Sequence, residues 1–420
     1  MRLTVQGRTP LTGNYQPSGN SNEAIALIAA SMLTPESVCL QSVPKTRAVR
    51  RMVEMAGELG AAVEWQETCL SLRTERIAER HIHTGHITRS VAAILFLAPI
   101  LARRDHATLE WEQSIGRLHT HFSAMRDLGI KIEIQGSIVK FTAQRWQKQD
   151  IILTGTSVTA TALVCMLAAV LGEETIIHNA ASEPHLRSLQ EMLVKMGAKI
   201  EGIGSNLIRI LGGNLSGAEH AIHPDHIEIA SIAAISAITP GHINIEAVVP
   251  ADLRMIQKVY ARLGITMIFE DNRLYVPEQA QLLISSRQED VDVEIDTAPW
   301  PGYPSDLIAI STVVATQANG TTLIHEKLFN NRLLFVDKLK AMGAQIILCD
   351  PHRAIVVGPT PLQSEYLDNP DIRIGLALLG AALCAEGQVI IDRAELIERN
   401  FENVIQKLVG LGAAIQVEDT

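Results

Sequence analysis

Residues 186–200 read LRSLQEMLVKMGAKI, and this stretch contains the pattern from which the fold is predicted. Its apolar residues recur at the spacing of one helical face: Leu186, Leu189, Leu193 and Met196. Gly197 stands just after the helix, where the backbone turns left-handed and glycine fits without strain. A strand then begins at Ala198. The stretch therefore predicts an amphipathic helix that ends in a glycine and leads into a strand.

The same pattern occurs six times, each time with a Leu-Gly or Met-Gly pair. The glycines are Gly60, Gly129, Gly197, Gly264, Gly343 and Gly412, at spacings of 69, 68, 67, 79 and 69 residues. Such a period exceeds the roughly 20 to 50 residues of a solenoid repeat, so each copy is predicted to be a small α/β unit. With 420 residues, we expect two domains of three repeats each.

Each repeat also contains an earlier helix that is apolar on all sides and is therefore expected to be buried. These six helices are predicted at 24–33, 91–102, 158–171, 227–238, 307–316 and 374–385. Polar residues stand where they begin: Ser21-Asn22, Thr88-Arg89, Thr156-Ser157, Asp225, Ser305-Asp306 and Asp371. One interpretation is ordinary capping. The other is that the helix axes converge, so that their positive ends face one bound anion.

Composition excludes several classes of function. The net charge is −10 and no basic stripe occurs, which disfavours a nucleic-acid partner. No apolar helix reaches the roughly 20 residues of a membrane span, and the start MRLTVQGRTPL lacks an apolar signal core. A cytoplasmic protein is therefore expected. Its five cysteines form no CxxC pair and are predicted to be reduced thiols: Cys39, Cys69, Cys165, Cys349 and Cys384.

A histidine cluster, HxHxxH, comprises His81, His83 and His86. Histidine is a common zinc ligand, but no carboxylate or cysteine is taken to be close by. The cluster is therefore interpreted as a solvated loop. No metal and no cofactor are expected.

The segment TAPWPGYPSD, residues 297–306, is the strongest local candidate for a site. Its three prolines stiffen the chain ahead of Asp306, at the start of a buried helix. Asp306 is interpreted either as a helix cap or as a positioned catalytic carboxylate. Arg332, Arg373 and Arg399 also stand near helix starts. Arginines are commonly only solvated, but several in one cleft would bind phosphate or carboxylate.

Taken together, the motifs resemble the enolpyruvyl transferases over the whole chain. They are TAPWPGYPSD, LFNNR with FVDKLKAMGA, NAASEPHLRSL, HPDHIEIAS and IERNFE. The similarity is greater to members that act on UDP-N-acetylglucosamine than to those that act on 3-phosphoshikimate. The resemblance implies an inside-out α/β barrel of two domains, each with three βαβαββ-type repeats. Residues 1–20 and 230–420 would form the domain with the catalytic Asp, and residues 21–229 the domain with a mobile loop.

The resemblance also implies the reaction. The enolpyruvyl group of phosphoenolpyruvate would pass to a hydroxyl of UDP-N-acetylglucosamine or a related nucleotide, and phosphate would leave, as in peptidoglycan biosynthesis. The protein would be a monomer or weak oligomer without a cofactor. Two further hypotheses stay open, namely the same chemistry on a different acceptor in a specialised pathway and a non-catalytic ligand-binding paralogue.

The family's site residues carry over by position. Asp306 stands at the catalytic base and Asn22 at the residue that contacts the acceptor hydroxyl. The residues expected to bind the pyruvyl and phosphate groups are Arg332, Arg373 and Arg399, of which Arg399 is also assigned to catalysis. Further cleft positions are matched by Arg89, by Arg117 as a replacement for the loop arginine, and by Leu328 and Phe329 in the nucleotide-sugar pocket.

Several positions depart from the family pattern. Ser21 stands where the family has its phosphate-binding lysine, and Gln113 stands at the loop cysteine that serves as general acid. The segment TATA at residues 159–162 replaces A-T-E-N and lacks its glutamate. Glu112 is one possible substitute acid, and His119 or His121 is a possible substitute cation. All the losses fall in the site, while the glycine and apolar skeleton is intact.

Overall fold

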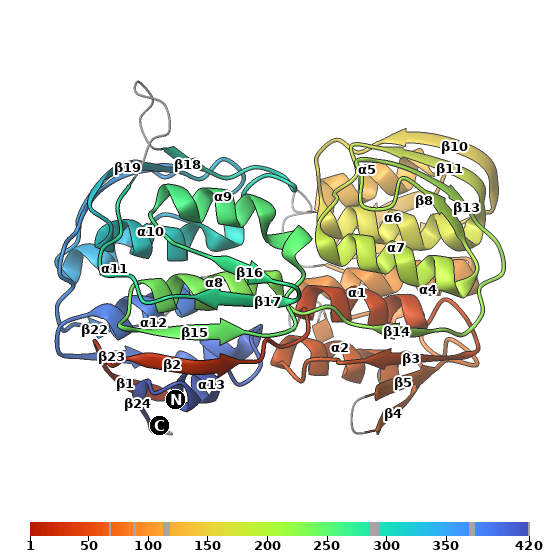
Figure 1. Cartoon of the computed structure of the whole chain (residues 1–420). Helices are drawn as coiled ribbons and strands as arrows, with labels where there is room; N and C mark the ends of the chain where they lie inside the picture. Colours follow the sequence, from red (N-terminus) through yellow and green to blue (C-terminus); the bar gives the residue numbers. More distant parts are fainter. Residues whose placement is uncertain are drawn as a thin grey trace. The chain divides into compact units, whose positions relative to one another are not determined.

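The computed structural model describes residues 1–66, 69–83, 85–86, 90–111, 118–284, 294–368 and 374–418. The chain divides into two compact units (Figure 1). Met1–Ser18 and Pro224–Thr420 form one, called here the terminal unit, and Gly19–His223 form the other, called the central unit. The chain thus crosses between the units twice, after Ser18 and after His223.

One complete repeat of the central unit shows the βαβαββ order. Its elements are β10 (Trp146–Ile152), α6 (Val158–Leu171), β11 (Gly172–His178), α7 (Pro184–Met196), β12 (Lys199–Glu201) and β13 (Leu207–Leu211). The sheet order is β10-β11-β13-β12. Strand β10 pairs parallel with β11, and the other two pairs are antiparallel. The predicted repeat is therefore present as a four-stranded sheet with one parallel edge strand.

The other two sheets of the central unit have the same plan, β14-β3-β5-β4 and β6-β7-β9-β8. Their strands are β14 (Glu219–Ala221), β3 (Ser37–Gln41), β5 (Cys69–Arg73), β4 (Ala62–Gln66), β6 (His81–Ile82), β7 (His106–Glu110), β9 (Ile138–Thr142) and β8 (Lys131–Gln135). Their helices are α1 (Ser21–Ser31), α2 (Arg47–Glu58), the 3₁₀ helix η1 (Val91–Phe96), α4 (Leu97–Arg104) and α5 (His119–Asp127). In both sheets the edge strand is again parallel to its neighbour.

The terminal unit contains three more such sheets, in the orders β16-β17-β15-β2, β18-β19-β21-β20 and β22-β23-β1-β24. The strands are β1 (Arg2–Gln6), β2 (Leu11–Tyr15), β15 (Gly241–Ile245), β16 (Ile268–Glu270), β17 (Arg273–Val276), β18 (Glu294–Asp296), β19 (Gly320–His325), β20 (Gln345–Asp350), β21 (Arg353–Gly358), β22 (Tyr366–Leu367), β23 (Gln388–Asp392) and β24 (Ala414–Glu418). The helices are α8 (His226–Ala237), α9 (Arg254–Arg262), α10 (Ile308–Gln317), α11 (Val336–Ala341), α12 (Gly375–Cys384) and α13 (Val404–Gly410), with 3₁₀ helices η3 (Pro250–Leu253), η4 (Ser305–Leu307) and η5 (Ala394–Arg399). Strand β1 lies between β23 and β24, so both ends of the chain belong to one sheet.

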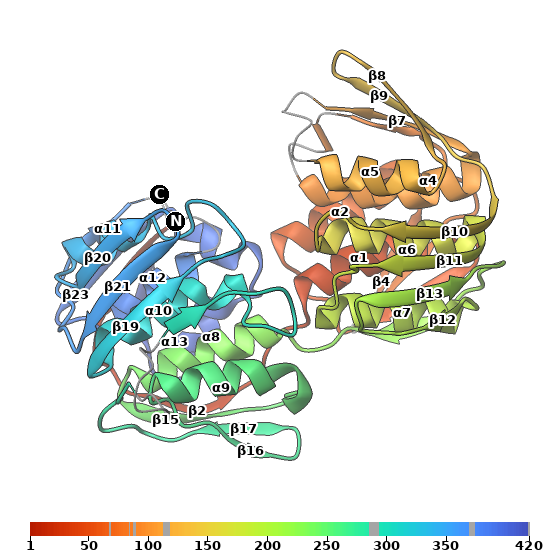
Figure 2. The same ribbon diagram turned by 90° about the horizontal axis from the view of Figure 1, so that it is seen from above.

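The apolar helices form the interior of each unit. Helices α8, α10 and α12 contact one another, and Figure 2 shows them between the sheets of the terminal unit. Every residue of α12 is buried. Helix α6 of the central unit contacts α4, α5 and α7 in the same way. Within the described part of the chain, no helix is both long and apolar enough to span a membrane. The apolar runs are therefore buried by the sheets, as their all-round hydrophobicity predicts.

The six repeat glycines all have a left-handed backbone, with φ between 85° and 120°. Gly197 follows α7 with φ 120°, and its N–H bonds back to the Val194 carbonyl. At Gly412, an added Cβ would lie 2.8 Å from the Pro10 carbonyl oxygen. The prediction that a glycine ends each outer helix is confirmed, because φ at all six positions favours glycine and the space at Gly412 is too small for a side chain.

The predicted helix caps are partly wrong. Asn20, and not Ser21 or Asn22, caps α1, because its side chain accepts from the Glu23 N–H at 3.0 Å. Ser157 and Asp225 cap α6 and α8 as predicted. Thr88, Arg89 and Asp371 lie outside the described residues.

The expectation of five reduced cysteines is wrong for one pair. Cys39 on β3 and Cys69 on β5 form a disulfide, with their Cα atoms 6.1 Å apart. The two strands are antiparallel neighbours, which brings together residues 30 positions apart in the sequence. Cys165 and Cys384 are buried free thiols, and burial raises the pKa of each to about 12.

Candidate functional site

The segment TAPWPGYPSD leads from β18 into the 3₁₀ turn η4, and α10 starts only at Ile308. Among the residues that the structure describes, no side chain caps η4 or α10. The interpretation of Asp306 as a helix cap is therefore wrong. Its side chain is 51% exposed and forms an ion pair with Arg332, Nη1 to Oδ1, at 3.0 Å. Asp306 is thus held at the surface of the terminal unit by a partner 26 residues away.

Arg332 is held by two contacts and is mostly buried, with a side chain only 11% exposed. Besides its bond to Asp306, its guanidinium lies 4.2 Å from the centre of the Phe329 ring. Its Nε is buried and has no hydrogen-bond partner among the described residues. A guanidinium fixed in this way retains donors that can bind a planar anion such as a carboxylate or phosphate.

Both residues line a cavity of about 430 Å³ in the terminal unit. Its other lining residues come from η4, the start of α10, the segment 330–338 and the residue before α12: Ser305, Ile308, Ala309, Asn330, Asn331, Leu334, Phe335, Lys338 and Ile374. The cavity therefore combines a carboxylate, a guanidinium and side-chain amides within a partly apolar wall. Such a mixture suits a polar, anionic ligand of moderate size.

Glu326 forms hydrogen bonds with both the TAPWPGYPSD and the LFNNR motif and was not identified from the sequence. The residue is fully buried. Its Oε1 accepts from Thr297 Oγ1 at 3.0 Å and from the backbone N–H groups of Leu328 and Phe329 at 2.8 and 3.1 Å. Its Oε2 accepts from the Ser305 hydroxyl. One carboxylate therefore fixes residues next to both Asp306 and Arg332.

The starts of the interior helices gather near this cavity. Burial, then the charge of Glu228 and, as a smaller cause, that of Asp306 raise the pKa of Asp225 to about 7. Helix α8, which Asp225 caps, contacts η4, the turn that contains Asp306. Ile374, directly before α12, lines the same cavity as Asp306. In the terminal unit these helix starts therefore lie near one another, and the start of α8 is also capped in the ordinary way.

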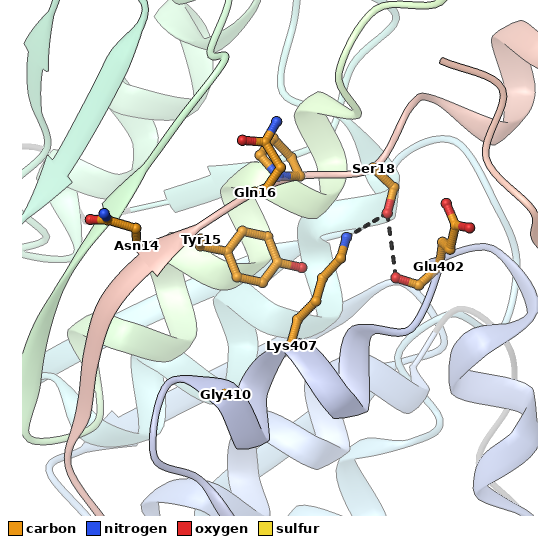
Figure 3. Close-up of a pocket in the computed structure, with 8 residues that line it drawn as sticks. Asn14, Tyr15, Gln16, Ser18, Glu402, Lys407 and Gly410 are labelled. Carbon is orange, nitrogen blue, oxygen red and sulfur yellow. Dashed lines mark hydrogen bonds between the residues drawn. The ribbon is translucent and has the colours of Figure 1, made fainter. Parts of the chain in front are cut away.

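A second cavity of about 430 Å³ in the terminal unit is shown in Figure 3. Lys407 points into it, and its Nζ lies 2.6 Å from the Ser18 hydroxyl and 2.9 Å from the carboxylate of Glu228. The Tyr15 hydroxyl also donates to Glu228, at 2.6 Å. Because buried Glu228 neutralises this lysine, the group is a structural ion pair beneath the chain crossing at Ser18.

The remaining residues predicted for the site are distributed as follows. Arg399 ends η5 and is not among the described residues that line the Asp306 cavity. Asn22 is exposed on the first turn of α1, in the central unit. Leu328 and Phe329 are 40% and 47% exposed beside Arg332. Arg89, Arg117 and Arg373 lie outside the described residues.

The structure describes two residues that concern the departures from the family pattern: Ser21, at the lysine position, and His121, a suggested substitute cation. Ser21 is buried, and its hydroxyl lies 3.1 Å from that of Thr46, so it points into the central unit. His121 is buried, and burial lowers its pKa to about 4, so it is neutral at pH 7. The burial of His121 therefore counts against the suggestion that it replaces the missing cation. Glu112 and Gln113 lie outside the described residues.

Known proteins match this chain along its whole length. The family model for EPSP synthase (3-phosphoshikimate 1-carboxyvinyltransferase) covers residues 5–408. The UDP-N-acetylglucosamine 1-carboxyvinyltransferase of Treponema denticola is 41% identical over 421 residues, which is 99% of each chain. That of Bradyrhizobium diazoefficiens is 40% identical and covers 99% of this chain and 98% of its own.

Solved structures share the fold. The enolpyruvyl transferase NikO from Streptomyces tendae superposes with a TM-score of 0.87 at 20% identity, over 99% of this chain and 98% of its own. An EPSP synthase from Acinetobacter baumannii does so with a TM-score of 0.78 at 16% identity, over 100% of both chains. At these identities the likeness concerns the fold alone, and it agrees with the predicted inside-out α/β architecture. From its six repeats, its motifs and these full-length matches, the chain belongs to the EPSP synthase family of enolpyruvyl transferases.

Proposed function

We propose that this protein transfers the enolpyruvyl group of phosphoenolpyruvate to a hydroxyl of UDP-N-acetylglucosamine and releases phosphate. Relatives about 40% identical over nearly their whole length are UDP-N-acetylglucosamine 1-carboxyvinyltransferases. The observation that carries the proposal is the pairing of Asp306 with Arg332 at a cavity of suitable size and polarity. A reaction at this cavity needs a base for the hydroxyl and cations for an anionic donor, and both are present.

In the proposed reaction, Asp306 accepts the proton of the attacking hydroxyl. The methylene carbon of phosphoenolpyruvate gains a proton from Glu112, the possible substitute acid, and the acceptor oxygen bonds to the neighbouring carbon. The resulting tetrahedral adduct then loses phosphate and returns a methyl proton to the Glu112 carboxylate, which leaves the enol ether. Arg332 binds Asp306 through Oδ1 and so fixes the orientation of the base. Its remaining donors stabilise negative charge on the pyruvyl or phosphate group.

The terminal unit contributes the catalytic Asp in this proposal, and the central unit contributes the mobile loop. Arg373 and Arg399 join Arg332 at the donor anion. Leu328 and Phe329 contact the nucleotide sugar, which agrees with their exposure beside Arg332. In the central unit, the residues matched by position to the family's site are Asn22 for the acceptor hydroxyl and Arg89 and Arg117 for anionic groups. A cytoplasmic monomer or weak oligomer acting in peptidoglycan synthesis fits this assignment.

The buried position of Ser21 favours a second candidate, a paralogue that binds ligand without turnover. Ser21 supplies no cation for phosphate, and Gln113 supplies no acid at the loop position. The same chemistry on a different acceptor stays a third hypothesis, so the test must distinguish three outcomes.

The test measures phosphate release by the full-length protein with phosphoenolpyruvate and each member of an acceptor panel. The panel contains UDP-N-acetylglucosamine, other nucleotide sugars, free nucleotides and 3-phosphoshikimate, and mass spectrometry identifies the product. We expect phosphate and an enolpyruvyl product with UDP-N-acetylglucosamine. Turnover with another acceptor alone would replace the proposed substrate. Calorimetric binding without turnover of any acceptor would overturn the enzymatic proposal.

A further inference from the structure

The HxHxxH motif forms part of a side-chain cluster that the mechanism does not use. One ligand atom from each of His81, His83 and Glu110 lies within 4.8 Å of the other two. All three residues belong to the central unit, in and directly after β6 and at the end of β7. We propose that these residues form a binding site for a divalent transition metal of the zinc class.

Strand pairing explains how the cluster forms. His81 and His83 are two positions apart on an extended segment, so their side chains point to the same face. The parallel register pairs His81 with Thr108 and Ile82 with Leu109, and its continuation places Glu110 opposite His83. The sequence-based interpretation as a solvated loop assumed that no carboxylate was close. Glu110 lies 27 positions after His83, and only the β6–β7 pairing brings it near.

The ligand types and spacing suit zinc. Two imidazoles and one carboxylate are a common three-residue zinc set, and a water molecule supplies the fourth ligand. With bonds of about 2.0–2.2 Å, ligand atoms in a tetrahedral site lie about 3.4 Å apart. The ligand atoms of His81, His83 and Glu110 already lie within 4.8 Å of one another. Side-chain rotation therefore suffices to close the site, and the exposed His83 leaves an entry path from solvent.

An unpartnered atom points independently to a ligand. His81 Nε2 is buried and forms no hydrogen bond within the described part of the chain. Buried polar atoms are normally paired, so such an atom needs an explanation. The Glu79 carboxylate accepts from the His81 backbone N–H at 3.0 Å, so a further negative charge lies beside the cluster.

A second cluster of similar composition, Glu23, His220 and His223, is less suitable. The Ser188 hydroxyl lies 2.6 Å from Glu23 Oε1 and 2.7 Å from His220 Nε2. Lys195 Nζ lies 3.3 Å from the other ring nitrogen of His220. A lysine donates only, so this contact places the ring proton on Nε2 and blocks that atom as a metal ligand. The cluster is a satisfied hydrogen-bond network, and it provides the matched control.

The test uses the full-length protein after treatment with a chelator. Zinc is titrated by calorimetry, Co²⁺ by visible absorption, and the melting temperature is measured with and without zinc. We expect one bound equivalent, the absorption bands of tetrahedral Co²⁺ and a rise in melting temperature that chelator reverses. His83→Gln and Glu110→Gln should each weaken zinc binding at least about tenfold, since even outer-shell changes at metal sites cost that much.

His223→Gln, in the second cluster, should bind zinc as the unchanged protein does. Circular dichroism verifies that each variant is folded. Absence of saturable binding by the unchanged protein would overturn the proposal. So would loss of binding in His223→Gln together with retention in His83→Gln, since it would place the metal in the second cluster.

Discussion

Glu326→Gln tests whether one buried carboxylate organises the Asp306 cavity. The carboxylate accepts hydrogen bonds from Thr297, Ser305, Leu328 and Phe329. Glutamine keeps the shape and the three contacts at Oε1, but it removes the charge. Hydrogen bonds to a charged group contribute about 1.5–3 kcal/mol and neutral ones about 0.5–1.5 kcal/mol. Part of this loss is offset because no charge is buried any longer. We therefore expect the free energy of unfolding to fall by about 1–3 kcal/mol.

The same substitution should slow the reaction because Ser305 adjoins Asp306 and Phe329 stacks on Arg332. A loss of about 1.4 kcal/mol in transition-state stabilisation corresponds to a tenfold fall in kcat/KM. Urea unfolding and steady-state phosphate release measure the two effects. Glu278→Gln, at an exposed position of the same unit, is the matched control and should change stability by less than about 0.5 kcal/mol. If Glu326→Gln is indistinguishable from this control in both assays, the assignment of Glu326 as a positioning residue is refuted.

Two further predictions concern charged groups of the terminal unit. Arg332→Lys keeps the positive charge but loses the planar contacts with Asp306 and Phe329. The KM for phosphoenolpyruvate should therefore rise about 10- to 100-fold. An unchanged KM in steady-state kinetics would exclude Arg332 from the donor site. Because the pKa of Asp225 is raised to about 7 in the folded protein, the folded state binds an extra proton between about pH 4 and pH 7, and stability falls as the pH rises through that window. Asp225→Asn retains the capping group but does not titrate. As the pH rises through this window, the free energy of unfolding of the variant should therefore increase by on the order of 2–4 kcal/mol relative to that of the unchanged protein. Parallel pH profiles of unfolding free energy for the two proteins would contradict the assignment.

Most of the fold could be predicted because its signals are local. The apolar spacing before Gly197 and the glycine itself lie within one short stretch, and so do the five equivalent patterns. Helix starts were less well predicted. Asn20 and Ser21 are both good capping residues, and the choice between them depends on where the helix begins.

The site was less predictable because its partners are distant in the sequence. Whether Asp306 caps a helix or faces a ligand depends on Arg332, 26 positions away. Glu326 carries no sequence signal beyond its place directly before Lys327 and the LFNNR motif. Glu110 and the Cys39–Cys69 disulfide likewise depend on strand pairing. Periodicity predicts which face of an element is buried, but it does not predict which side chains then meet.

The central claim is tested most directly by comparing the turnover of Asp306→Asn with that of the unchanged protein. The acceptor is the one found by phosphate release, and urea unfolding verifies that the variant is folded. Asp306 caps no helix, so the substitution should change stability by no more than about 1 kcal/mol. Loss of a positioned base should lower kcat by about 10²- to 10⁴-fold. A folded Asp306→Asn protein that retains more than about a tenth of the original turnover would contradict the proposed mechanism.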